Sequence, residues 1–330
     1  MQQAHCHQRI QVAMSACKLG EALSVQPGNA TAAAAAPKPY IKEEIALKSL
    51  LRNARCPLHL YILVAADADA EIVRSWLQRL RSPWQPVTYS FVTIDDGAVL
   101  ERLAAIHGPL KGYMGYCGLA RMFFTEFLPH EERVLWLDTD TVVNGDVCQL
   151  WPHFDCFNAS QIIGFPGDPT IPNLHHPFGL CSCVALMDLT RMRAAGWGGS
   201  FMAAALEAHL KVNPSEVFPY GDQDVLRIVQ RHYPDSAYRL PSGWNVMPFC
   251  PAYDAAMHET AVDAFVGIIH FTCTVKQHIY SSMASFGRWA WLVQFYADMR
   301  WEWLNEGRSD LRMFERQPIH VGNMSSHARV

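Results

Sequence analysis

The sequence predicts an α/β fold in which a mainly parallel sheet is flanked by helices. Between residues 10 and 94, apolar runs of strand length alternate with segments whose apolar residues recur at helical spacing, a pattern typical of parallel strands joined by right-handed crossovers. The run 58–65 is apolar apart from His59, as expected of a strand covered on both faces. Half of the 330 residues are hydrophobic and 18% are charged, which is enough apolar material for one large core.

The elements follow in order along the chain. After a first strand, residues 27–40 with their alanine run and prolines form a low-complexity insertion. The segment 113–127 is predicted to be a helix that ends before Pro129. The predicted strands are 10–16, 58–65, 87–94, 133–137, 161–165, 183–188 and 266–271. The predicted helices are 43–53, 70–80, 113–127, 201–210, 222–229 and 284–304. We expect one domain over 1–282, with 283–330 as an aromatic-rich helix and tail packed on it.

Charge and hydropathy exclude two broad classes. The net charge of −4 argues against a general nucleic-acid binder, since no basic field offsets phosphates. No run approaches the ~20 apolar residues that a membrane span needs, and residues 1–8 do not resemble a signal peptide. Either the protein is soluble or an N-terminal anchor lies outside this chain.

Ten cysteines are spread over the chain without a Cys-x-x-Cys pair. We expect buried thiols together with one or two disulfides. Three Asn-x-Ser/Thr sequons, at Asn29, Asn158 and Asn323, favour a secretory location only weakly, because sequons arise often by chance.

The segment Asp138-Thr139-Asp140 at the end of the fourth strand is the first chemical signal. Residues i and i+2 of a strand face the same way, so two carboxylates lie on one side, about 6–7 Å apart along the backbone. The carboxyl ends of strands are where open α/β sheets bind ligands. Hard oxygen donors suit Mg²⁺ or Mn²⁺ bridging a diphosphate, and such a cation stabilises the charge of a departing nucleoside diphosphate.

The two aspartates are also compatible with a cap or with a phosphatase. An aspartate after a strand often caps a helix or forms an Asx-turn. An Asp-nucleophile phosphatase also carries Asp-x-Asp-x-Thr/Val, with Asp138 as the phosphoryl acceptor and Asp140 as a general acid. That motif is expected on an opening strand, and three strands precede it here. An EF-hand is excluded, because Gln149 occupies the closing glutamate position.

Later motifs add candidate partners for these carboxylates. His270 ends a predicted strand and would complete a metal site, favouring Mn²⁺ over Mg²⁺. Lys276 follows six residues later and would present a compact charge to a diphosphate. The segment 220–224 opens a helix with acids that favour the helix dipole or reach sugar hydroxyls. Trp244 and Asn245 would supply an aromatic platform and a polar contact for a sugar.

Together, these motifs resemble glycosyltransferase family 8, the family of glycogenin, bacterial lipopolysaccharide galactosyltransferases and animal glucoside xylosyltransferases. The resemblance runs in order from the first strand to about Lys276. Its segments are 119–121, 133–143, 221–224 and 270–276, and the segments 187–193 and 244–250 look closest to the glucoside xylosyltransferases.

The resemblance implies a single GT-A domain with a Rossmann-like sheet and a retaining transfer from a UDP-sugar to a glycan or glycoprotein. Xylose is the favoured sugar, with glucose or galactose as alternatives. It also implies Golgi or ER lumen as the location, with cytoplasm as the alternative.

The same resemblance implies a role for individual residues. Mn²⁺, with Mg²⁺ as the alternative, would be held by Asp138, Asp140 and His270. The remaining roles are diphosphate contact for Arg121, Cys273 and Lys276, uridine contact for Ser15, Ala16 and Cys17, and donor-sugar positioning or stabilisation for Asp222 and Gln223.

The sequence departs from the family pattern at three cysteines. Cys181 and Cys183 stand where the family has an asparagine and a glycine, and Cys273 replaces the glycine of the His-x-x-Gly segment. A β-carbon at Cys273 would be expected to crowd the space of a diphosphate. An alternative function is therefore a catalytically impaired homologue that binds nucleotide-sugars or glycans.

Overall fold

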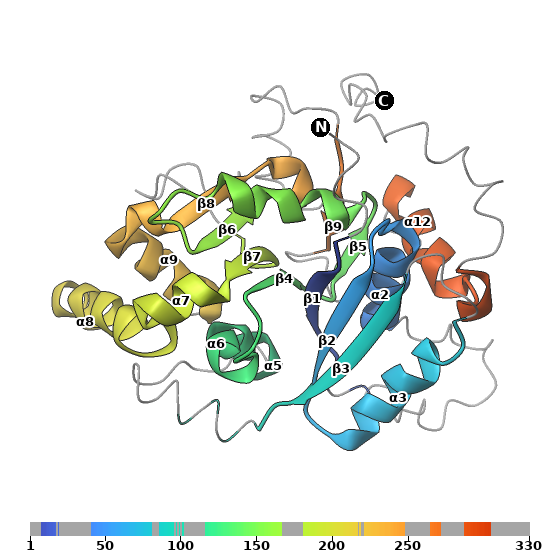
Figure 1. Ribbon diagram of the computed structural model, residues 1–330, viewed down its shortest axis with the longest axis horizontal. Coiled ribbons are helices and arrows are strands. Elements are labelled where there is room, and N and C mark those ends of the chain that lie inside the picture. The colour runs from blue at the N-terminus through green and yellow to red at the C-terminus, as the bar shows by residue number, and fades with distance from the viewer. Residues whose placement is uncertain are drawn as a thin grey trace, which may run out of the picture.

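The protein folds around a seven-stranded sheet (Figure 1). The computed structural model describes residues 8–17, 19, 41–80, 86–95, 97, 99, 101, 116–166, 181–216, 218, 221–247, 265–271 and 287–304. The strand order is β3-β2-β1-β4-β7-β6-β8, and a separate two-stranded sheet pairs β5 with β9. The predicted α/β class is confirmed. The insertion at 27–40 lies outside the described residues.

The strands are β1 Ile10–Ser15, β2 Leu58–Val64, β3 Val87–Thr93, β4 Arg133–Leu137, β5 Thr141–Val143, β6 Ile163–Pro166, β7 Val184–Asp188, β8 Ala237–Leu240 and β9 Ile268–His270. Four of the six pairings in the large sheet are parallel, and β7 runs antiparallel to both of its neighbours. The sheet is therefore mainly parallel. β5 and β8 were not predicted, because runs of three and four residues are too short for a pattern.

The α-helices are α2 Lys42–Asn53, α3 Asp67–Leu77, α5 Tyr116–Leu119, α6 Phe124–Phe127, α7 Leu189–Ala195, α8 Met202–Val212, α9 Asp222–His232 and α12 Gly287–Asp298. The predicted helix over 113–127 is wrong as a single element. Its described part consists of α5, a 3₁₀ turn at Ala120–Phe123 and α6, and Phe123 has a non-helical ψ of 20°. All of residues 119–124 are buried, so every side of this segment packs against the protein. Tertiary packing therefore outweighs the preference of the segment for one regular helix.

Two hydrophobic clusters cover the two faces of the sheet. Strand residues alternate between them: Leu135 and Leu137 of β4 join the cluster with α2 and α3, whereas Val134 and Trp136 join the cluster with α7, α8 and α9. This alternation is the period of a strand buried on both faces. In Figure 1, α2, α3 and α12 accordingly lie towards one end of the molecule and α7, α8 and α9 towards the other.

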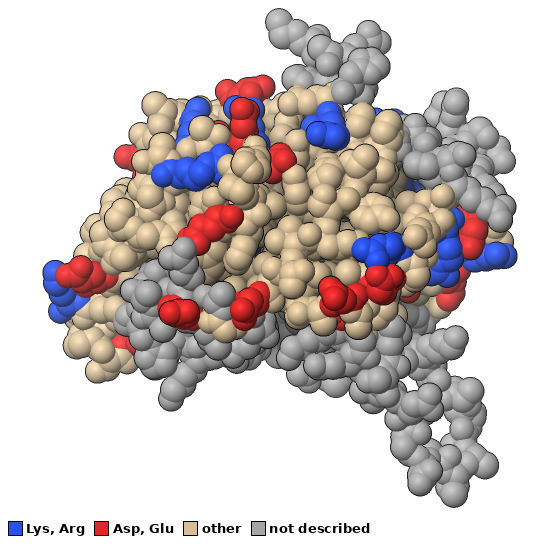
Figure 2. Space-filling model, turned by 60° about the horizontal axis from the view of Figure 1, so that its bottom comes forward, with Lys and Arg blue, Asp and Glu red and all other residues tan. Residues whose placement is uncertain are grey.

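The C-terminal described segment packs on α2. Four hydrogen bonds join side chains of α2 to it, which are Asn53 Nδ2 to Tyr296 Oη (2.8 Å), Arg52 Nη1 to Leu304 O (2.9 Å), Lys48 Nζ to Ala297 O (3.4 Å) and Trp301 Nε1 to Glu44 Oε1 (2.8 Å). The division of the chain at residue 282 stays a prediction. No described helix is long and apolar enough to cross a bilayer. On the face shown in Figure 2, the acidic (red) and basic (blue) side chains of the described residues are interspersed with each other.

Candidate metal and nucleotide-sugar site

Asp138 lies at the carboxyl end of β4 and is held in one orientation. Its backbone N–H donates to Cys183 O at 2.8 Å, which extends the β4–β7 pairing by one residue. Its Oδ1 accepts hydrogen bonds from Arg121 Nη1 and Trp136 Nε1, each at 2.8 Å. Because both donors bind Oδ1, the orientation of the carboxylate is fixed. The second oxygen, Oδ2, is then the one that can coordinate a cation.

Arg121 joins Asp138 to Asp222. Its side chain is only 3% exposed, and its Nε lies 2.8 Å from Asp222 Oδ2. Its Nη1 also donates to Ser182 O at 2.8 Å. Burial alone would lower the pKa of Arg121, but the carboxylates of Asp138 and Asp222 together raise it above its ordinary value. The guanidinium therefore stays cationic and ties two segments of the site together.

Asp222 is fully buried at the first position of α9. The preceding Gly221 has φ 59° and ψ −120°, a backbone conformation that side chains with a β-carbon rarely adopt. This turn directs α9 so that Asp222 meets Arg121. Burial raises the pKa of Asp222, while Arg121 partly offsets the shift. Gln223 follows at a half-buried position.

Strand pairing brings His270 to Asp140. β9 runs antiparallel to β5 with Thr141 opposite His270, and Phe271 N–H donates to Asp140 O at 2.9 Å. His270 Nε2 consequently lies 3.5 Å from Asp140 Oδ1. Burial would lower the pKa of His270, but Asp140 and then Cys181 raise it to about 10. The ring thus carries a proton that a bound cation would displace.

Asp138, Asp140 and His270 form a candidate metal site, since one ligand atom from each lies within 4.8 Å of the others. Two carboxylate oxygens and an imidazole nitrogen are a donor set that fits a divalent cation such as Mn²⁺. These three residues are the set that the sequence predicted as ligands.

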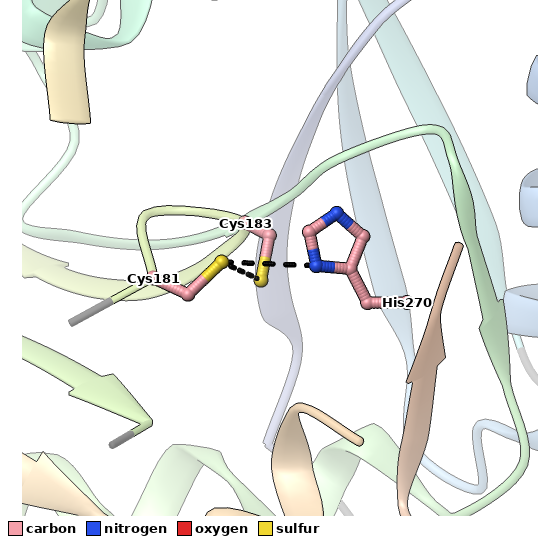
Figure 3. A group of neighbouring side chains, drawn as sticks. All are labelled: Cys181, Cys183 and His270. Atoms are coloured by element: carbon pink, nitrogen blue, oxygen red, sulfur yellow. Dashed lines mark hydrogen bonds between the residues drawn. The ribbon is translucent and has the colours of Figure 1, made fainter. Parts of the chain in front are cut away.

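Two thiols, those of Cys181 and Cys183, lie next to the His270 ring (Figure 3). Asn245, which is fully buried, accepts a hydrogen bond from Cys183 Sγ at 3.1 Å, and its Oδ1 lies 3.2 Å from His270 Nδ1. Burial raises the pKa of the Cys183 thiol, and the neighbouring Cys181 raises it further. Asn245 therefore contacts His270 and Cys183, and its predicted sugar contact stays a prediction.

The remaining predicted residues have different surroundings. Ser15 and Ala16 line a pocket next to Thr139, whereas Cys17 is joined to Cys117 by a disulfide. Trp244 is 3% exposed and packs edge-to-face on Phe265 at 4.9 Å, an arrangement typical of a core residue rather than an open platform. Cys273 and Lys276 lie outside the described residues.

Glu43 is a candidate site residue that the sequence did not reveal. Its side chain lines the pocket of Ser15, Ala16 and Thr139 and is 13% exposed. Burial raises its pKa, and Lys42 at 3.6 Å opposes that shift. In the sequence, an acid in the first turn of a helix is explained fully by the helix dipole. Only the position of α2 beside the end of β1 shows a second possible role.

Comparisons with known proteins fit this geometry. Residues 41–157 match the family model described as glycosyl transferase family 8. The xylosyl- and glucuronyltransferase LARGE2 of Mus musculus is 28% identical over 253 residues, which cover 73% of this chain and 35% of that protein. The xylosyl- and glucuronyltransferase LARGE1 of Homo sapiens is 30% identical over 214 residues, covering 61% and 27%. The chain thus spans about a quarter to a third of the length of these relatives.

Solved structures show the same fold. Mouse xyloside xylosyltransferase 1 in its apo form matches with a TM-score of 0.60 at 18% identity, over 81% of this chain and 98% of that one. The galactosyltransferase LgtC, solved with donor and acceptor sugar analogues, matches with a TM-score of 0.59 at 17% identity, over 87% and 95%. The resemblance to family 8 and the GT-A fold predicted from the motifs are confirmed.

Replacing Arg121 with methionine is expected to lower the free energy of unfolding by about 3–5 kcal/mol, because the buried Asp222 carboxylate loses its cation. Denaturant unfolding measures the change. The double variant Arg121→Met, Asp222→Asn should lose less, since it leaves no buried charge on α9. Lys211→Met, at an exposed position, is the control and should leave the midpoint unchanged. A single variant as stable as wild type would contradict the proposed constraint.

Proposed function

We propose that this chain, a relative of the family 8 glycosyltransferases, transfers a sugar from a UDP-sugar to a glycan or glycoprotein with retention of configuration. The observation that carries the proposal is the convergence of Asp138, Asp140 and His270 at the edge of the sheet. Xylose is the favoured sugar, because the names of the mammalian relatives and of one structural neighbour include xylosyltransferase. Glucose and galactose are the alternatives.

The metal of this proposal is Mn²⁺, with Mg²⁺ as the alternative, held by Asp138, Asp140 and His270. When bound, it neutralises negative charge on the departing diphosphate. The imidazole favours Mn²⁺, because nitrogen ligands suit it better than Mg²⁺. Arg121 supports the site from behind by fixing the Asp138 carboxylate.

The remaining residues bind and position the donor. Asp222 and Gln223, at the amino end of α9, would contact the donor sugar near its reacting, anomeric carbon. We assign no covalent nucleophile, and the ion pair of Asp222 with Arg121 favours a positioning or stabilising role. Lys276 would contact the diphosphate, whereas Arg121, buried between Asp138 and Asp222, would act on it only through the Asp138 carboxylate. We also place the nucleoside in the pocket of Ser15 and Ala16, where Glu43 offers an acceptor for its N–H and O–H groups.

A binding protein without turnover is the second candidate, and the two thiols favour it. Cys181 and Cys183 stand close to His270, where the family pattern has an asparagine and a glycine. Such a protein would bind UDP and Mn²⁺ in calorimetry but release no UDP from any donor. A donor screen that measures UDP release with and without Mn²⁺ separates the two candidates.

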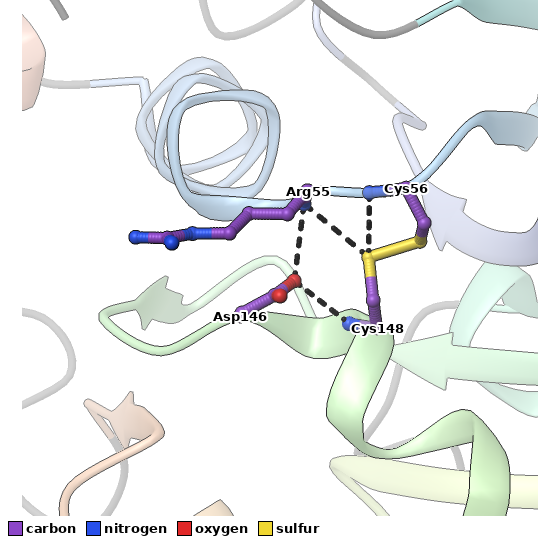
Figure 4. The surroundings of a disulfide bond; sticks show 4 residues. All are labelled: Arg55, Cys56, Asp146 and Cys148. Atoms are coloured by element: carbon purple, nitrogen blue, oxygen red, sulfur yellow. Dashed lines mark hydrogen bonds between the residues drawn. A yellow bond between two sulfur atoms is a disulfide. The ribbon is translucent and has the colours of Figure 1, made fainter. Parts of the chain in front are cut away.

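We also propose a location in the Golgi or ER lumen. The described residues contain two disulfides, Cys17–Cys117 and Cys56–Cys148, and disulfides persist mainly in oxidising compartments. The second joins the chain after α2 to the turn after β5, where Asp146 Oδ1 accepts from Arg55 N and Cys148 N, each at 3.1 Å (Figure 4). Asn158 is exposed in a turn, as a glycan acceptor must be.

Asp140→Asn is expected to lower Mn²⁺-dependent UDP release by more than about 100-fold, since it removes a metal ligand. Asp155→Asn is the matched control, because that carboxylate is 67% exposed and pairs only at 3.4 Å with Arg133. A coupled assay of UDP release with Mn²⁺ titration measures both. UDP release by Asp140→Asn within twofold of wild type would refute the metal role.

Glu43→Gln is expected to raise KM for the UDP-sugar by about 10- to 100-fold with kcat little changed, the size of one hydrogen bond to a charged group. The metal affinity should stay within a few-fold, which distinguishes a nucleoside contact from a metal ligand. Glu71→Gln, on the exposed side of α3, is the control. An unchanged KM would remove Glu43 from the donor pocket.

Chain made in a secretory host is expected to carry a glycan on Asn158. Peptide mapping before and after treatment with peptide N-glycosidase checks this, and Asn158→Gln should lose the modified peptide. The same map, run without reductant, should contain the Cys56–Cys148 peptide pair. An unmodified Asn158 together with free Cys56 and Cys148 would argue for the cytoplasm.

A further inference from the structure

Two thiols and an imidazole converge beside the carboxylate site (Figure 3). Cys181 and Cys183 directly precede β7, and His270 ends β9. One ligand atom from each of the three lies within 4.8 Å of the others. All three residues are buried, with exposures of 4%, 1% and 4%. Residues distant in the sequence thus place three metal-ligating groups in one closed position.

The two ring nitrogens of His270 face different neighbours. Nε2 lies 3.5 Å from Asp140 Oδ1, on the side of the carboxylates. Nδ1 lies 3.7 Å from Cys181 Sγ and 3.2 Å from Asn245 Oδ1. The imidazole therefore separates a set of oxygen ligands from a set of sulfur ligands, and each set has its own nitrogen.

The sulfur set differs from the oxygen set in the metal that it selects. Thiolates are soft ligands that favour Zn²⁺, Cd²⁺ or Cu⁺ over Mn²⁺ and Mg²⁺. Two cysteines and one histidine, with a fourth position left for water or another donor, are a ligand set that zinc adopts in proteins. Asn245 Oδ1 lies 3.1 Å from Cys183 Sγ and is within reach of that fourth position.

Binding requires only a small movement of the thiols. The two sulfurs are 2.9 Å apart. A tetrahedral ion with Zn–S bonds of about 2.3 Å separates its sulfurs by about 3.8 Å. Rotation of the side chains about χ1 covers that difference. A disulfide would need the sulfurs to approach to about 2.05 Å instead and would leave His270 Nδ1 without a part in the cluster.

We propose that Cys181, Cys183 and His270 Nδ1 form a second site, which binds a thiophilic divalent ion such as Zn²⁺. Because His270 belongs to both sets, an ion in the sulfur site holds the imidazole in the orientation that the thiolates require. Resting on the proposed function, we further infer that Zn²⁺ at this site lowers Mn²⁺-dependent transfer.

Cd²⁺ tests the site without any assay of activity, since cadmium thiolates absorb in the ultraviolet. The chain, under a mild reductant that leaves the Cys17–Cys117 and Cys56–Cys148 disulfides intact, is titrated with Cd²⁺ in excess Mg²⁺. The signal of the site is the absorption lost in Cys183→Ser, with Cys181→Ala as a second variant in case the first does not fold. Either variant should bind Cd²⁺ at least about 100-fold more weakly. Cys156→Ser, at an exposed thiol, is the control and should keep the full signal.

Zn²⁺ should displace the bound Cd²⁺ and thereby abolish the Cd²⁺-thiolate absorption. The variant Asp138→Asn should show the same Cd²⁺-thiolate absorption as wild type. Equal absorption by wild type and both cysteine variants would overturn the site, as would a Cys181–Cys183 disulfide that reforms and excludes Cd²⁺. In a separate measurement, Zn²⁺ should inhibit UDP release by wild type more strongly than by Cys183→Ser. Absence of UDP release under all conditions would refute the proposed function, while the Cd²⁺ result would still decide the sulfur site.

Discussion

The buried guanidinium of Arg121 is the interaction on which the arrangement of the site depends. Taking a cation out of water costs several kcal/mol unless carboxylates compensate it. Here the compensation comes from Asp138 after β4 and from Asp222 at the start of α9, each 2.8 Å away. The guanidinium of Arg121 pairs with both carboxylates at once. The position of α9 relative to β4 is therefore fixed by charge as well as by apolar packing.

The second constraint is the small sheet of β5 and β9, which carries His270 to Asp140. Its register is supported by close packing, since a β-carbon on Gly267 would lie 2.5 Å from Trp244. The Trp244 ring thus packs directly on the backbone that leads into β9, and the next residue, Asn245, lies against His270. The orientation of the His270 ring, which Asn245 contacts, thus depends on packing several residues away.

Much of this architecture follows from the sequence, because β1, β2 and β4 are mainly apolar runs, and β1 ends at the polar residue Ser15 and β4 directly before Asp138. What sequence reasoning missed is non-local. The direction of β7 depends on its partners, and the break in the segment 116–127 follows from burial on every side of it. Arg121 was expected at a phosphate, whereas its contacts with two carboxylates depend on α9, about 100 residues later. Glu43 was not singled out from the sequence, because an acid in the first turn of a helix is explained by the helix dipole alone.

The cysteines alter how the two halves of the site are coupled. A glycine at position 183 would offer no side chain to Asn245, but the Cys183 thiol donates to Asn245 Oδ1, which also lies against His270 Nδ1. A change at the thiols therefore reaches the Nδ1 atom of His270 through the Asn245 amide oxygen. The Nε2 atom of the same ring lies next to Asp140. The hard and soft ligand sets cannot be independent, because a single imidazole ring has one orientation at a time. The departure from the family 8 pattern at Cys181 and Cys183 therefore changes the groups that surround His270, the residue that we propose as a metal ligand.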